Sequence, residues 1–366
     1  MDRYIFNLKC LRDWCELDYK SQKKIIDYFK NMEHIRWETV SVESKTFNIE
    51  GKINLPFGAS NYSYLDQYNA FMSKLKDYDT DYITPKSIYY SDALRNMDHS
   101  PEILYSKGNR SLVSSGQRVA IVGSRRPTSY GRKVASELSK FLAAHGVTVV
   151  SGLALGIDAI AHKAALDMSS NTIAVMASGV NRAYPRTNAS IYHEIIQNDG
   201  LILSEKAFDE APKPYEFPLR NRLISAISDI VVIIEAAEAS GTLTTAMHGL
   251  NQGKTIFALP GSIYSELSRG TNKLIYDGAL PLINFEDILL ELGIETIDKS
   301  MIKKDFSNLS PVAMEVMNLI SKGKKMEINR ICEEMMLEYS EIISAINELI
   351  LEELCDFASL TEVEVK

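Results

Sequence analysis

Residues 118–150 read RVAIVGSRRPTSYGRKVASELSKFLAAHGVTVV, and this stretch decides the fold. After Arg118, residues 119–122 are all apolar, and residues 147–150 form a second short run of β-branched residues. Between the two runs, apolar residues recur at the spacing of one helix face: Val134, Leu138, Phe141 and Leu142. A strand, an amphipathic helix and a second strand, both strands apolar throughout, predict a parallel sheet that helices cover on both faces.

The same alternation continues toward the C-terminus. Apolar runs follow at 172–176, 200–203, 230–234 and 255–259, and helical patterns lie between most of them. The sequence therefore predicts an α/β fold, a Rossmann-like doubly wound parallel sheet, over residues 83–296.

The two ends of the chain differ from this central region in composition and in hydrophobic pattern. Residues 1–82 are rich in Lys, Asp, Tyr and Asn, and their short helical stretches predict a small helical accessory domain. A charged segment at 298–305 is expected to be a linker. Residues 306–366 then hold three helical patterns and a short strand at 354–360, which predicts a winged-helix-like domain.

Composition narrows the class of protein. The 366 residues suggest two or three domains, and 45% hydrophobic with 24% charged residues is typical of a globular protein. We expect a cytoplasmic protein without a membrane partner, because no apolar run could span a bilayer and the N-terminus lacks a signal-peptide core. The four cysteines have no CxxC spacing, which argues against a metal site and against disulfides.

The net charge of −8 means that any nucleic-acid site must be a local basic patch. Residues 118–140 hold six Lys or Arg against one acid, and Arg125 and Arg126 stand in the turn after Gly123 and Ser124. The turn lacks the second glycine of GxGxxG, and no strand-end carboxylate follows to hold a ribose, which argues against a dinucleotide. We interpret it as a phosphate-binding turn; the alternative is a solvated helix face beside a glycine turn.

Other turns after strands also carry polar groups, and in a doubly wound sheet these turns share the ligand edge. In the turn at 151–158, Asp158 is expected to cap or orient the next helix. We interpret His162, four residues later, as a structural residue, and a general base is the alternative. Further cations, amides and small hydroxyl residues follow at 179–188, 217–222 and 240–242. The complete candidate set is Gly123, Ser124, Arg125, Arg126, Gly179, Arg186, Asn188, Arg220, Asn221, Arg222, Ser240, Gly241 and Thr242.

Seven motifs in one order resemble the DNA-processing protein A family (DprA/Smf), over about residues 90–280. They are Val-Gly-Ser-Arg at 122–125, Ser-Gly-Leu-Ala…Gly-Ile-Asp…Ala-His at 151–162, Tyr-Pro-Arg-x-Asn at 184–188, Phe-Pro-x-Arg-Asn-Arg at 217–222, Glu-Ala…Ser-Gly-Thr-Leu at 235–243, Pro-Gly-Ser at 260–262 and Gly-Thr-Asn-Lys-Leu-Ile…Gly-Ala at 270–279. The resemblance implies a SAM-like N-terminal domain and a homodimer that binds single-stranded DNA. It also implies loading of RecA recombinase during natural transformation, without catalysis and without a cofactor. Leu155 stands where relatives often carry a basic residue.

Two other hypotheses remain open on the residues alone. Rossmann-type phosphoribohydrolases share the glycine-threonine turn but carry a glutamate three residues after the threonine, where this chain has Thr245. A threonine cannot act as a carboxylate acid or base, which disfavours hydrolysis. A nucleotide-sensing module is the other hypothesis, because one mononucleotide could occupy the same turns.

Overall fold

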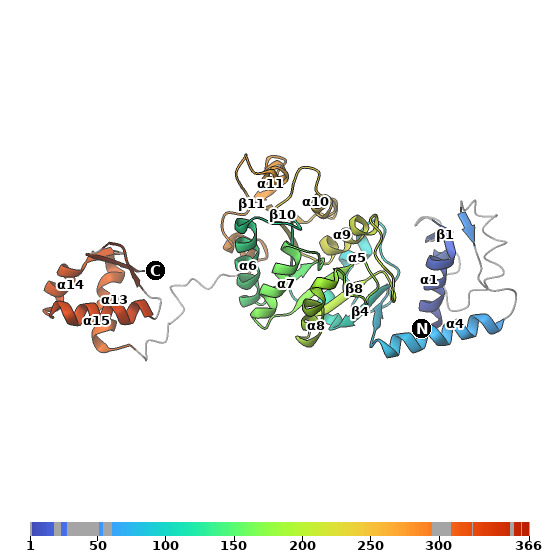
Figure 1. Ribbon diagram of the computed structural model, residues 1–366, viewed down its shortest axis with the longest axis horizontal. Helices are drawn as coiled ribbons and strands as arrows, with labels where there is room; N and C mark the ends of the chain where they lie inside the picture. Colours follow the sequence, from blue (N-terminus) through green and yellow to red (C-terminus); the bar gives the residue numbers. More distant parts are fainter. Residues whose placement is uncertain are drawn as a thin grey trace. The chain divides into compact units, whose positions relative to one another are not determined.

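The computed structural model describes residues 2–17, 23–27, 51–53, 61–294, 309–323, 325–351, 355–359 and 361–365. The chain divides into two compact units, Met1–Ile294 and Glu295–Lys366 (Figure 1). The charged linker predicted at 298–305 lies outside the described residues.

A nine-stranded sheet forms the centre of the first unit, in the order β11-β10-β9-β5-β6-β7-β8-β4-β3. Seven neighbouring strands, from β11 to β8, are parallel, which confirms the predicted doubly wound sheet. Their bounds are β5 Arg118–Val122, β6 Thr148–Ser151, β7 Thr172–Met176, β8 Leu201–Ser204, β9 Ile230–Ile233, β10 Thr255–Ala258 and β11 Leu280–Pro281. Because β5 lies between β6 and β9, the strand order reverses there, and ligands of such sheets bind at this switch point.

Two antiparallel strands extend the sheet beyond β8, and the sequence pattern did not predict them. The strand β4 (Leu104–Gly108) pairs with β8, and β3 (Asp81–Ile83) pairs with β4. Of the two, only β3 is an edge strand, which need not be apolar throughout, and Asp81 in it and Lys107 in the neighbouring β4 interrupt the apolar pattern.

Helices cover both faces of the sheet (Figure 1). In β5, Val119 and Ile121 belong to one core and Ala120 and Val122 to the other, as alternation along a strand requires. The first face carries α6 (Ser129–Ala144), α7 (Ile157–Asp167), α8 (Ala189–Gln197) and α12 (Glu286–Glu291). The second face carries α5 (Asp92–Asn96), α9 (Glu216–Ala226), α10 (Thr242–Asn251) and α11 (Glu266–Tyr276).

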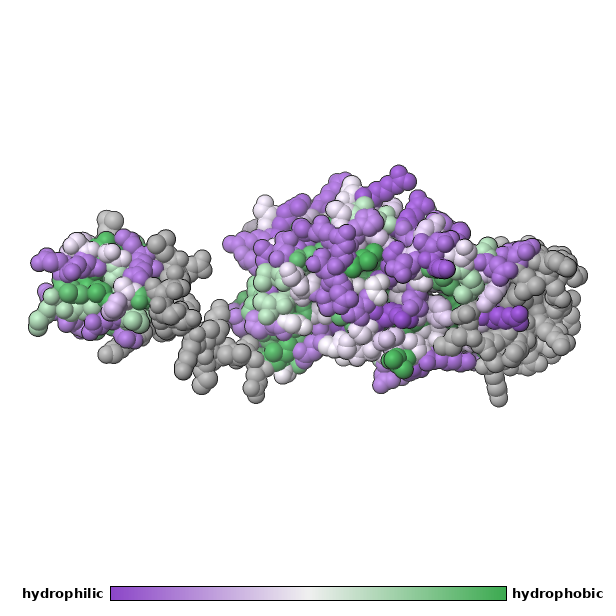
Figure 2. Space-filling model, turned by 90° about the horizontal axis from the view of Figure 1, so that it is seen from below, coloured by the Kyte–Doolittle hydropathy of each residue, from purple (hydrophilic) through white to green (hydrophobic). Residues whose placement is uncertain are grey.

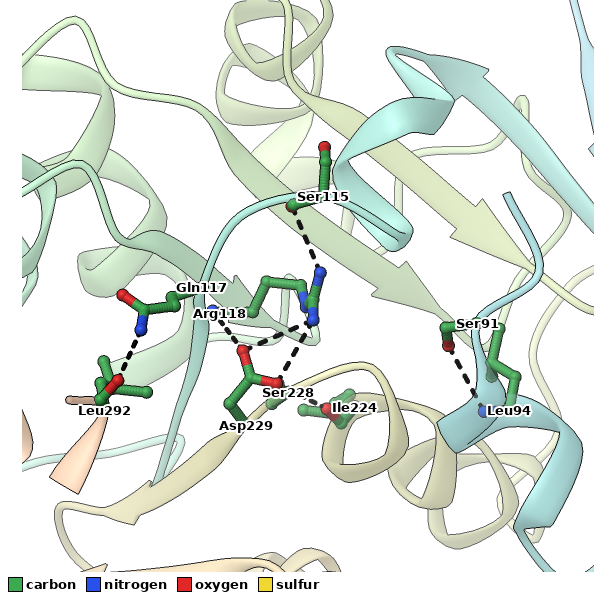
Figure 3. Close-up of polar contacts among 9 residues, drawn as sticks. All are labelled: Ser91, Leu94, Ser115, Gln117, Arg118, Ile224, Ser228, Asp229 and Leu292. Carbon is green, nitrogen blue, oxygen red and sulfur yellow. Dashed lines mark hydrogen bonds and ion pairs between the residues drawn. The ribbon is translucent and has the colours of Figure 1, made fainter. Parts of the chain in front are cut away.

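An ion pair joins β5 and β9 at their amino ends, away from the predicted ligand edge. Asp229 accepts a hydrogen bond from the backbone N–H of Arg118 at 2.8 Å and lies 3.3 Å from its guanidinium (Figure 3). Gln117 donates to the carbonyl of Leu292 at 2.6 Å in the same region. The contacts of Asp229 with Arg118 align the two strands that flank the switch point, and Gln117 ties the start of β5 to the end of α12.

The N-terminal helices pack aromatic rings against the β4 end of the sheet. The helices are α1 (Asp2–Trp14) and α4 (Asn61–Asp77), and β1 (Cys15–Leu17) pairs with β2 (Gly51–Ile53) beside them. The ring of Phe71 lies 5.6 Å from Phe6, 6.4 Å from Tyr105 and 5.9 Å from Phe208. Aromatic burial therefore ties this segment to the sheet.

The described residues of the second unit form three helices and a three-stranded antiparallel sheet in the order β12-β14-β13. Its elements are α13 Pro311–Gly323, β12 Lys325–Glu327, α14 Ile328–Met335, α15 Tyr339–Leu351, β13 Cys355–Phe357 and β14 Glu362–Val365. Val316 and Ile320 of α13 and Ile342 and Ile346 of α15 lie in its core.

The face of the molecule in Figure 2 is mostly hydrophilic, and its apolar residues lie in small patches. Among the described helices, none is both long and apolar enough to cross a membrane. Within the same residues, no cluster of His, Cys, Asp or Glu could hold a metal ion.

Candidate nucleic-acid interface

A cleft of about 700 Å³ opens at the carboxyl ends of β5 and β9. The turn after β5, one side of α9 and the turn that enters α10 line it. A smaller hollow of about 70 Å³ shares Arg125, Ala154, Phe217 and Arg220 with the cleft and adds Tyr184. The switch point of the sheet therefore carries a real concavity, at the position predicted from strand order.

Close backbone packing shapes the base of the cleft. Gly156 has a φ of +78°, and a Cβ there would lie 2.3 Å from the carbonyl oxygen of Ser124. That same carbonyl accepts a hydrogen bond from the N–H of Ile157 at 3.1 Å. A Cβ on Gly123 would lie 2.7 Å from the side chain of Ile157. Glycine at both positions thus lets the turns after β5 and β6 touch.

Gly156→Ala is expected to destabilise the first unit by about 3 kcal/mol or more, because it adds a backbone clash to the cost of a positive φ. Gly146→Ala is the matched control, since Gly146 has a φ of +71° but nothing within 4 Å of its Cβ position. It should lose only about 1 kcal/mol. Urea unfolding of both variants measures the difference, and equal losses would contradict the close approach at Ser124.

Arg125 is the exposed cation of the cleft. Its guanidinium lies 5.1 Å from the ring centroid of Phe217, and that ring lies 5.9 Å from Tyr184 at an interplanar angle of 45°. Tyr184 is 44% exposed. Arg126 is also exposed, and its backbone N–H donates to the Ser124 hydroxyl at 3.1 Å. An exposed cation can bind a phosphate, and the aromatic rings beside it can stack a base.

Arg220 also lines the cleft, but it is buried and is used by the fold. Its Nη1 donates to the carbonyls of Gly152, at 2.7 Å, and of Val175. Burial lowers the pKa of Arg220 to about 10, nearby Asp158 raises it, and Arg125 lowers it. The Arg220 guanidinium therefore stays protonated at neutral pH, and its charge makes the electrostatic potential in the cleft more positive.

Asp158 holds the turn before α7 instead of capping that helix. Its carboxylate accepts from the backbone N–H groups of Gly152, at 3.1 Å, and Ala154, at 3.3 Å. The N-cap of α7 is Gly156, without a side-chain hydrogen bond. Burial raises the pKa of Asp158, and Arg220 together with these hydrogen bonds opposes that rise.

His162 is structural, as the favoured interpretation had it. The ring is fully buried, and its Nδ1 lies 2.8 Å from the Thr172 hydroxyl. Burial, with Arg220 nearby, lowers the pKa of His162 to about 3, so the ring is neutral.

The predicted residues at 221 and 240–242 form one connected turn. Asn221 donates to the carbonyl of Gly241 at 3.2 Å and to the hydroxyl of Thr244 at 2.9 Å. Thr242 donates through its hydroxyl to the carbonyl of Gly123 at 3.2 Å, and its N–H donates to Ser240 at 3.2 Å. The turn is therefore tied to the β5 turn, and it places the positive end of the α10 dipole at the cleft.

The 179–188 turn divides its predicted residues between two roles. Asn188 is buried and donates to the carbonyls of Leu153 and Ala154, at 3.0 and 3.1 Å. Gly179 packs against backbone, since its Cβ position lies 2.9 Å from the nitrogens of Asp209 and Glu210. Arg186 is exposed on the short helix η3 (Arg186–Asn188), outside the lining of the cleft.

Arg222 is separated from the other candidates. Residues two apart on a helix point roughly 200° apart, so Arg220 and Arg222 leave α9 on opposite sides. Arg222 is buried and lies 2.7 Å from the carboxylate of Glu205. It lines a different cavity, described below.

One acidic residue that supports the site, Glu235, was missing from the candidate set. Glu235, which follows β9, is 2% exposed and accepts from the N–H of Thr128 at 2.9 Å and from its hydroxyl. It thereby supports the start of α6 behind the basic turn. Thr245 is buried in the cleft wall, and Asp158 is the one carboxylate among the described residues that line the cleft. A carboxylate directly after an apolar strand was the available signal for Glu235.

The fold and the cleft define a class: a Rossmann-type protein with a cationic and aromatic ligand edge in place of a dinucleotide loop. The family model for DNA recombination-mediator protein A matches residues 81–293, more than half of the chain. The chain therefore belongs to the DNA recombination-mediator protein A family, as the motifs indicated.

Relatives show the same likeness over part of their length. Protein Smf of Escherichia coli is 44% identical over 155 residues, which are 42% of this chain and 41% of that one. DNA processing protein DprA of Bacillus subtilis is 36% identical over 199 residues, 54% of this chain and 67% of the relative. The matched region thus spans less than half of the Escherichia coli protein.

Two solved structures of DNA processing protein A are similar to this one. The Streptococcus pneumoniae structure has a TM-score of 0.65 at 30% identity and covers 80% of this chain and 98% of its own. The Helicobacter pylori structure, which concerns single-stranded DNA binding, has a TM-score of 0.53 at 36% identity, with 58% and 95% covered.

Proposed function

We propose that this protein binds single-stranded DNA along the cleft and acts as a DNA-processing mediator in transformation. The observation that carries the proposal is the exposed Arg125 stacked on Phe217 beside Tyr184. The single-stranded DNA binding mode for which the Helicobacter pylori structure is described supports it by analogy. Arg125, Arg126 and Arg186 contact phosphates, and the positions at 123–124 and 240–242 let the backbone approach. Arg220, Asn188, Asn221 and Gly179 hold the cleft in shape.

A single strand fits this edge better than a duplex does. Unstacked bases can lie on exposed aromatic rings, and a flexible backbone can follow cations on separate turns. A duplex is read by an element that enters its major groove, and short turns at a sheet edge offer no such element.

The rest of the proposal follows from the family: the protein acts as a homodimer, loads RecA recombinase onto the bound strand and does not catalyse a reaction. Hydrolysis of nucleotides is disfavoured because Thr245 occupies the position of the required glutamate. Asp158 cannot replace it, since two backbone N–H groups and the potential of Arg220 already engage that carboxylate.

We expect labelled oligo-dT to bind, a duplex of equal length to bind more weakly, and excess AMP neither to displace the oligo-dT nor to be cleaved. A gel-shift titration with AMP as competitor, followed by chromatography of the nucleotide, measures all of these. Displacement of the oligo-dT by AMP would favour the nucleotide-sensing hypothesis. Release of adenine would favour the phosphoribohydrolase.

The second unit, whose three helices and antiparallel sheet suit a winged helix, is proposed to contact protein and not to be the main DNA-binding site. Residues 301–366 hold seven Lys or Arg against thirteen Asp or Glu, and such a surface repels phosphates. A chain that ends at Ile294 should therefore keep its oligo-dT affinity within a few-fold. A hundredfold loss in the same titration would place the binding site in the second unit.

A further inference from the structure

The buried side chain of Arg222 is incompletely paired. It is 8% exposed, and its Nη2 lies 2.7 Å from one carboxylate oxygen of Glu205. Its Nε and Nη1 have no hydrogen-bond acceptor in the described part of the chain. Arginine and carboxylate usually pair through two bonds, and a buried charged donor left without an acceptor is costly. The guanidinium therefore needs an acceptor from outside.

Gln252, at the end of α10, has a buried acceptor without a hydrogen-bond donor among the residues that the structure describes. Its Nε2 donates to the carbonyl of Arg222 at 3.0 Å, which joins α10 to α9. Its Oε1 is buried and has no donor within the described residues. One small region thus contains unused buried donors and an unused buried acceptor.

Both residues line a cavity of about 350 Å³ on the second face of the sheet. The cavity lies between α9, the end of α10 and the segment at 93–99, and it shares no lining residue with the DNA cleft. Its size lies at the lower end of the range for small-molecule sites. Water alone could fill it, but the charged groups around it favour an anion.

Lys254 supplies a second cation to the cavity. Burial lowers its pKa from the ordinary lysine value, and Asp229 opposes that shift. Asp229 is itself paired with Arg118 (Figure 3), so it does not neutralise Lys254 fully. Burial and the charge of Arg222 lower the pKa of His248, which also lines the cavity. The acids nearby are Glu205, on Arg222, and Asp98, which is exposed among the lining residues.

We propose that this cavity binds the phosphate monoester of a nucleotide. Arg222 and Lys254 hold the phosphate, since guanidinium and ammonium groups are the usual phosphate ligands. Gln252 accepts a hydrogen bond from the base or the sugar, which a simple phosphate ion lacks. A free nucleotide and the 5′-phosphorylated end of a DNA strand share this chemistry.

Calorimetric titration of the full chain with AMP, in the presence of saturating 5′-hydroxyl oligo-dT, tests the proposal. AMP should bind while the cleft is occupied, and inorganic phosphate should compete with it. Lys254→Gln should weaken AMP binding about tenfold or more, the value of a charged hydrogen bond, and leave the oligo-dT affinity unchanged. Lys163→Gln is the control, since this exposed lysine of α7 lies outside both cavities.

The source of the phosphate follows from a second titration, with oligo-dT that carries a 5′-phosphate. If it binds more tightly than the 5′-hydroxyl strand, and Lys254→Gln abolishes the difference, the ligand is a DNA end. If both strands bind alike while AMP binds, the ligand is a free nucleotide. The proposal is overturned if AMP fails to bind, if oligo-dT displaces it, or if Lys254→Gln binds AMP like wild type. None of these results bears on the DNA cleft, whose occupation is measured separately.

Discussion

Arg125→Ala is expected to weaken the binding of oligo-dT by roughly tenfold or more at low salt, the loss of one charge-assisted contact. It should also flatten the slope of log K against log salt by about 0.7. The variant neutralises one phosphate fewer on the single strand, so binding releases fewer counterions. The side chain is exposed and is not used by the fold, so the folded state should be preserved.

The double variant Arg125→Ala, Arg186→Ala should flatten the slope by about 1.4, since Arg186 is a second exposed cation on the neighbouring turn. Both losses should be nearly independent of base sequence, because phosphate contacts do not read bases. Arg95→Ala is the matched control: Arg95 also lies over an aromatic ring, at 5.2 Å from Tyr90, but it lines neither the cleft nor the Arg222 cavity. Titrations at several salt concentrations measure the slopes, and an unchanged slope in a folded variant would place the DNA path elsewhere.

Arg220→Met is expected to cost about 3–5 kcal/mol in the free energy of unfolding, the usual result of leaving a buried charge without the opposite charge that compensates it. The variant leaves Asp158 buried without its compensating cation, and it removes the donor from the carbonyls of Gly152 and Val175. Arg126→Met, on the exposed β5 turn, is the control and should change stability by about 0.5 kcal/mol or less.

The cost of Arg220→Met should also depend on pH. The pKa of Asp158 is raised in the folded state, so its contribution to stability is complete below the unfolded pKa and is lost as pH rises through the folded pKa. Without Arg220 the folded pKa rises further, and the loss extends to higher pH. Urea unfolding should therefore show a smaller difference from wild type at pH 5 than at pH 8. Asp158→Asn in the same background should remove most of that dependence. A difference constant with pH would contradict the coupling of Asp158 to Arg220.

The sequence by itself determined the parallel part of the sheet and the edge at which sheets of this kind bind ligands. Strands buried on both faces leave unbroken apolar runs such as 230–234, and the helices between them leave a 3.6-residue period. Both signals are local, so one sequence was enough to read them. The exposed Arg125 was also predictable, because a turn after a buried strand must reach the surface.

Tertiary structure alone decided which of the candidate residues reach the cleft. Asn188 looked like a ligand in its motif, but its amide is used to hold the carbonyls of 153 and 154. Arg220 and Arg222 stand in one motif, yet one lies under the cleft and the other lines a separate cavity. The motif names residue types without saying which face of α9 meets the sheet edge. The face of α9 that meets the sheet edge is set by contacts between residues far apart in the chain. One example is the hydrogen bond between Arg220 and Gly152, which are separated by 68 positions, and no local sequence pattern predicts it.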